Sequence, residues 1–141
     1  MTQFPDRIPL RAAHAPLVLR LALAAVFASH GITRLVMDRV TPFGEVLDKW
    51  GFPFGIAWAW GVTLFEILAA ALLLVNRAVK PVCLLLVVEM ATGIWFVHWK
   101  HGWFVVGHGQ NGMEYSFMLI AALLALISLQ PGVKHEKKHG A

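Results

Sequence analysis

Cysteine is nearly absent from this sequence, because Cys83 stands alone among 141 residues. A single cysteine cannot form an intrachain disulfide, a C-x-x-C dithiol or a C-x-x-C-H haem attachment site. It also disfavours a quinone-linked enzyme that forms disulfides, since thiol–disulfide exchange needs paired cysteines. The sequence contains no glycine-rich phosphate-binding loop either, and therefore no nucleotide is implied.

Charged residues are also scarce. They make up 14% of the chain, whereas apolar residues make up 58%, and an average soluble domain has roughly 25% charged residues. This balance excludes an ordinary soluble domain and predicts an integral membrane protein in contact with the lipid bilayer. The length predicts a single membrane domain over residues 1–141. The net charge of +4 needs no nucleic-acid partner, because the basic residues are explained by membrane anchoring.

Long apolar runs take up most of the chain. A helix needs roughly 20 apolar residues to cross the hydrocarbon core of a bilayer. The runs are continuous and rich in alanine and leucine, without the period of two of a membrane β-barrel. We therefore predict an all-α fold, an integral membrane four-helix bundle. Its transmembrane helices are expected at about residues 15–37, 54–76, 79–99 and 114–130.

Basic residues in the short connections predict the orientation, since lysine and arginine favour the cytoplasmic side. Seven of them lie at the two ends and in the turn after the second run, and four lie in the opposite connections. The bundle is therefore expected to be N-in/C-in, with all six tryptophans towards the outer face. The first set is Arg7, Arg11, Arg77, Lys80, Lys134, Lys137 and Lys138, and the second is Arg34, Arg39, Lys49 and Lys100.

Ionisable residues inside the predicted spans are the first candidates for a site, because a charge in the membrane is costly and is usually paired or functional. His30 and Arg34 are four residues apart and therefore share one face of the first helix. Arg20 lies on nearly the same face, about 21 Å deeper. Glu66 and Glu89 stand near the middle of the second and third helices. They could be buried partners of Arg20 or Arg34, or they could bind a ligand or act in catalysis.

A second group of candidates follows the third run. His98 and His101 are three residues apart, between Trp95, Trp99 and a glycine-broken stretch that contains His108. Such histidines could hydrogen-bond a quinone head group, ligate haem or a metal, or simply lie at the membrane interface. The tryptophans could anchor the interface or line a ligand. The cofactor stays open at this point, and no specific metal ligand is assigned.

The order and spacing of four short motifs resemble the DoxX family of small bacterial membrane proteins. The resemblance covers about residues 20–129. In this family a His-Gly pair and a basic residue stand in the first helix, a Glu in the second, and a Gly-x-Glu at the start of the fourth. The motifs are "HGITRL", "FEILAAALLLV", "HWKHGWF" and "NGMEYSFMLI", and the matching residues are His30, Gly31, Arg34, Glu66, Gly112 and Glu114.

The resemblance implies a four-helix protein of the bacterial inner membrane that is assembled with redox partners. We therefore expect a membrane subunit of a quinone-linked redox system, with quinone preferred to haem or a metal as its cofactor. His30 and Glu66 are the expected catalytic residues. The alternative is a non-enzymatic membrane scaffold that binds a partner protein or a second copy of the chain. The expected ligand-binding residues are Arg34, Glu89, His98, His101, Glu114, Trp95 and Trp99.

Overall fold

The computed structural model describes residues 12–107 and 109–130, and all its regular elements in these ranges are helices. The predicted all-α class is confirmed. Short 3-10 segments, Ala12–His14 and Trp99–His101, and a π-helical segment, Ile94–His98, extend the ends of longer helices. The α-helices are α1 (Ala15–Val36), α2 (Val40–Lys49), α3 (Gly55–Leu74), α4 (Val79–Gly93) and α5 (Glu114–Leu129).

Three helical segments are long and apolar enough to cross a membrane: Ala15–Val36, Gly55–Leu74 and Val79–His101. They lie where the first three apolar runs predicted them. The fourth run forms α5, which has only 16 residues and is therefore about 24 Å long. This is shorter than the roughly 30 Å of a typical hydrocarbon core. The structure thus shows three candidate spans and one shorter apolar helix.

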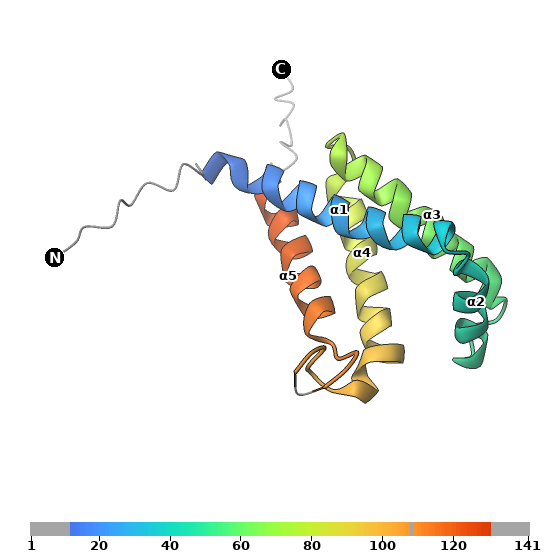
Figure 1. Cartoon of the computed structure of the whole chain (residues 1–141). Coiled ribbons are helices and arrows are strands. Elements are labelled where there is room, and N and C mark those ends of the chain that lie inside the picture. Colours follow the sequence, from blue (N-terminus) through green and yellow to red (C-terminus); the bar gives the residue numbers. More distant parts are fainter. Residues whose placement is uncertain (1–11, 108, 131–141) are drawn as a thin grey trace, which may run out of the picture.

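The apolar helices pack as two antiparallel pairs, α1 with α3 and α4 with α5, which cross each other in Figure 1. All four helices contribute to one hydrophobic core, through residues such as Phe27, Leu73, Leu86 and Leu123. The two helices of the first pair approach each other closely at Gly31. A Cβ atom there would lie 2.7 Å from Cγ1 of Ile67, so the missing side chain lets α1 and α3 pack closely.

The helix α2 was not predicted from the sequence. It is amphipathic and packs against α3 through buried residues that include Gly44 and Leu47. Asp48 Oδ1 accepts a hydrogen bond of 2.8 Å from the backbone N–H of Gly55, the first residue of α3. A side chain at Gly55 would collide with the Gly44 carbonyl and with Asp48, so the glycine is required by this contact.

Aromatic side chains connect the end of α2 to the π-helical extension of α4. The ring of Phe96 lies 4.9 Å from the ring of Phe52 and 6.5 Å from that of Trp50, measured between centroids. Phe52 also contacts Trp58 near the start of α3, at 6.1 Å. Three separate segments therefore contribute to one aromatic cluster, which contains two of the six tryptophans.

Candidate functional site

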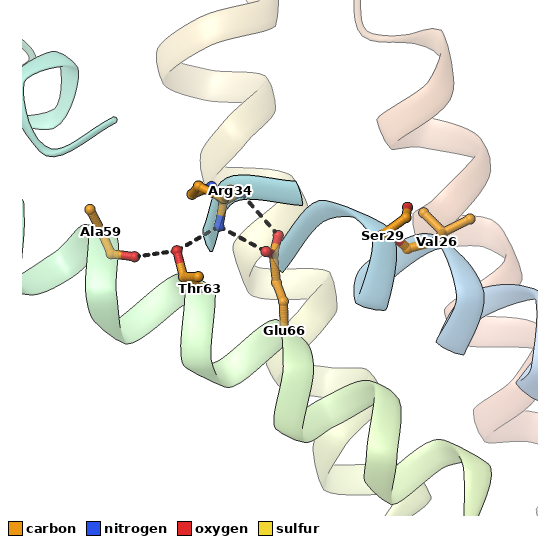
Figure 2. A network of polar contacts seen from close by, with 6 residues as sticks. All are labelled: Val26, Ser29, Arg34, Ala59, Thr63 and Glu66. Carbon is orange, nitrogen blue, oxygen red and sulfur yellow. Dashed lines mark hydrogen bonds and ion pairs between the residues drawn. The ribbon is translucent and has the colours of Figure 1, made fainter. Parts of the chain in front are cut away.

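An ion pair joins the last turn of α1 to the middle of α3. The Nη1 atom of Arg34 donates hydrogen bonds to Oε2 of Glu66, at 2.8 Å, and to Oγ1 of Thr63, at 2.9 Å. The Thr63 hydroxyl in turn donates to the carbonyl of Ala59, at 2.7 Å. Figure 2 shows this chain of contacts along one face of α3. Of the alternatives that the sequence left open for Glu66, the structure shows a buried ion pair with Arg34.

The pair is held in a mostly apolar environment. The exposed fraction of the side chain is 15% for Arg34 and 3% for Glu66. The guanidinium also lies over the ring of Phe43 from α2, 4.6 Å from its centroid, a cation–π arrangement that fixes its plane. Losing either charge would leave the other one buried and unpaired, which is strongly unfavourable. The arrangement therefore holds the head of Arg34 in one orientation.

Glu89 brings α4 into the same group. Its carboxyl group interacts electrostatically with Glu66 and with Arg34. Its Oε2 atom is buried and has no hydrogen-bond partner among the described residues. Of the two arginines considered in the sequence, Arg34 is the partner of the glutamates. The buried Nε atom of Arg20 has no hydrogen-bond partner in the described part of the chain. We call Arg34, Thr63, Glu66 and Glu89 the Arg34 network.

An open hollow lies beside the Arg34 network. Its lining comes from α1 and the residue that precedes α2, and we call it the α1 hollow. His30 is exposed there, whereas Arg34 is half-buried and belongs to both the hollow and the network. The lining is polar, although α1 is otherwise mostly apolar, and its side chains can form hydrogen bonds. The lining residues are Ser29, His30, Thr33, Arg34 and Arg39.

Two other candidates, His98 and Glu114, hold the connection between α4 and α5. The Nδ1 atom of His98 lies 2.7 Å from the carbonyl oxygen of Asn111, to which it donates. Oε1 of Glu114 accepts a hydrogen bond of 3.1 Å from the backbone N–H of Val105. In the part of the chain that the structure describes, neither side chain hydrogen-bonds to Arg34 or Glu66. Their observed contacts order the connection rather than extend the Arg34 network.

The remaining candidates lie on the surface. His101 ends the 3-10 segment that follows α4, the exposed Trp99 begins it, and the exposed Trp95 lies in the preceding π-helical segment. His108 lies outside the described residues. Within residues 12–107 and 109–130, no three histidine, cysteine or acidic side chains come together as a metal site. The open surface around these tryptophans fits the role of interface anchors.

Two members of the site were missed in the sequence. Thr63 lies three residues before Glu66, so helical spacing places both on one face of α3 and could have indicated it. Phe43 had no such signal, because it belongs to a helix that the apolar runs do not include.

Comparison with known proteins agrees with this architecture. The DoxX family model matches residues 15–99, which contain α1 to α4 and therefore Arg34, Thr63, Glu66 and Glu89. No curated protein matches the chain. No solved structure matches it either. Because the family match covers more than half of the 141 residues, this multi-helix membrane protein belongs to the DoxX family.

Proposed function

We propose that this DoxX-family chain is the membrane subunit of a quinone-linked redox system in the bacterial inner membrane. In this proposal the four apolar helices form one bundle with both termini in the cytoplasm. The quinone head group binds in the α1 hollow, in the outer half of the bundle. A partner subunit that carries a redox centre exchanges electrons with the quinone.

The observation that carries the proposal is the way Arg34 is held. A guanidinium has five N–H donors, and three hydrogen bonds to Thr63 and Glu66 use three of them. Two N–H groups remain without a hydrogen bond among the described residues, on a side chain that lines the α1 hollow. A quinone carbonyl is an acceptor that can satisfy such donors, and its ring suits an apolar surrounding.

The residues have separate tasks in this mechanism. Arg34 and His30 donate hydrogen bonds to a quinone carbonyl oxygen and stabilise the negative charge that develops on it during reduction. Glu66 holds Arg34 in position and takes part in proton transfer. Reduction of one quinone to quinol requires two electrons, which the partner subunit supplies, and two protons.

The test is a titration of the detergent-purified chain with a short-chain ubiquinone, followed by quenching of tryptophan fluorescence. We expect saturable binding to the natural chain, and a loss of about tenfold in affinity for His30→Ala, since a hydrogen bond to a charged or polar ligand contributes roughly 1.5 kcal/mol. His101→Ala is the matched control, because His101 is exposed on the extension of α4 and does not line the hollow.

Two results would count against quinone binding. Quenching that never saturates would indicate partition of the ubiquinone into detergent, and equal affinities of His30→Ala and His101→Ala would remove the hollow from the mechanism. The scaffold alternative gives a different outcome. A quinone-free chain that co-purifies with a stable partner, and loses it in His30→Ala, would show that a protein covers the exposed polar face of α1.

A further inference from the structure

The Arg34 network combines three ionisable groups from three helices. Arg34 comes from α1, Glu66 from α3 and Glu89 from α4. The ionisable residues of α5 are Glu114 and Tyr115 at its first turn, and Glu114 is bound to Val105. The wall of the adjacent hollow adds two further ionisable side chains, His30 and Arg39.

The two glutamates are not equivalent. Both oxygens of Glu66 face Arg34, with Oε2 at 2.8 Å from Nη1 and Oε1 at 3.5 Å from Nη2. No described donor hydrogen-bonds to Oε2 of Glu89, although this atom is buried. An ionised carboxylate is an acceptor on both oxygens and needs donors when it is buried, whereas a protonated carboxylic acid is neutral.

The balance of charges also favours one protonated carboxyl group in the Arg34 network. With both carboxyl groups ionised, one guanidinium faces two negative charges, which leaves an uncompensated charge inside a membrane-spanning helix group. Protonation of one of the two carboxyl groups makes the Arg34 network neutral. Because an isolated buried charge is costly there, the neutral arrangement is favoured.

We infer that the Arg34 network holds one proton on Glu89, next to the ion pair of Arg34 and Glu66, and that Glu89 is the proton-holding residue of the site. The presence of this proton does not depend on quinone. Its delivery does rest on the proposed function: Glu89 would supply one of the two protons that a quinone takes up with two electrons from the partner subunit. Water supplies the second proton and returns one to Glu89.

The proton can be observed directly by infrared spectroscopy of the purified chain, without added quinone, at neutral pH. A protonated carboxyl group has a carbonyl stretch that shifts when H₂O is replaced by D₂O, which separates it from the carbonyl of a co-purified quinone. We expect this band in the natural chain. It should be lost in Glu89→Gln and retained in Glu45→Gln, the control, because Glu45 is an exposed carboxyl group on α2.

Two further variants test the charge count. Glu66→Gln should also lose the band, because the single remaining carboxyl group then pairs with Arg34. Arg34→Gln should roughly double it, because two carboxyl groups then lack a cation. Absence of the band in the natural chain, or its persistence in Glu89→Gln, would overturn the inference.

Thermal stability in detergent identifies which glutamate holds the proton. Glutamine resembles a neutral glutamic acid in shape and charge. Glu89→Gln should therefore unfold within a few degrees of the natural chain, whereas Glu66→Gln should unfold at a clearly lower temperature because it breaks the ion pair. The opposite order would place the proton on Glu66. If Glu66→Gln does not fold, the infrared and thermal results for Glu89→Gln still decide the assignment. Failure of ubiquinone binding, with the band present, would reject only the proposed function.

Discussion

The guanidinium of Arg34 lies 2.8 Å from the carboxylate of Glu66, and this contact joins two membrane-spanning helices. The sequence separates the two residues by 32 positions. In a membrane, hydrophobic burial does little to hold one helix against another, because lipid is as apolar as the helix surfaces. Close packing at Gly31 and the ion pair therefore define how α1 sits against α3.

Replacing Glu66 by alanine should destabilise the chain strongly. The change removes the carboxylate that hydrogen-bonds to the half-buried guanidinium of Arg34, and we expect a loss of about 3–5 kcal/mol in the free energy of unfolding. Thermal unfolding in detergent, followed by circular dichroism, measures the effect. Glu45→Ala is the control, since Glu45 is exposed on α2 and should change stability by less than about 0.5 kcal/mol. Equal stability of the two variants would contradict a stabilising role for the pair.

The hydroxyl of Thr63 should contribute less than Glu66 to the stability of the chain, but by a measurable amount. It accepts a hydrogen bond from Arg34 and donates one to the Ala59 carbonyl. Thr63→Val keeps the shape and removes the acceptor, with an expected loss of about 1 kcal/mol. Thr92→Val is the matched control, because the exposed Thr92 hydroxyl bonds only to the Val88 carbonyl of its own helix. The prediction fails if Thr92→Val costs as much as Thr63→Val.

Packing of α2 against α3 should depend on the lack of a side chain at Gly55. Gly55→Ala places a Cβ atom against the Gly44 carbonyl and within 2.7 Å of Cγ of Asp48. We expect a loss of about 1–3 kcal/mol from this overpacking. Gly61→Ala in the same helix meets no atom within 4 Å and should be neutral or slightly stabilising, since alanine favours helix more than glycine does. A harmless Gly55→Ala would argue against this packing of α2.

Orientation can be tested with alkaline phosphatase, which becomes active only in the oxidising periplasm. We expect a fusion at the C-terminus to be inactive in intact bacterial cells, and a fusion after Gly107, in the connection between α4 and α5, to be active. The orientation was predicted from basic residues, several of which lie outside the described residues. The reporter measures the orientation directly. The reverse activities would invert the proposed topology.

Much of the fold could be predicted from the sequence, because a membrane helix has a strong local signal. Twenty apolar residues in a row must satisfy their backbone hydrogen bonds internally, and only a helix does this within one segment. The bounds of α1, α3 and α5 therefore lie within about two residues of the predicted ones. The amphipathic helix α2 was missed because it has only 10 residues and mixes polar with apolar side chains.

The candidate site, like the fold, could be predicted only in part from the sequence. Arg34, Glu66 and Glu89 could be selected in the sequence, because a charge within an apolar run has few explanations. Which arginine pairs with the glutamates depends on how the helices cross. The tertiary structure pairs Arg34 with Glu66 and brings Glu89 within electrostatic range of both. It assigns the observed contacts of His98 and Glu114 to the connection that precedes α5. Local composition determines that helices form, whereas their close contacts decide which of the buried charges meet.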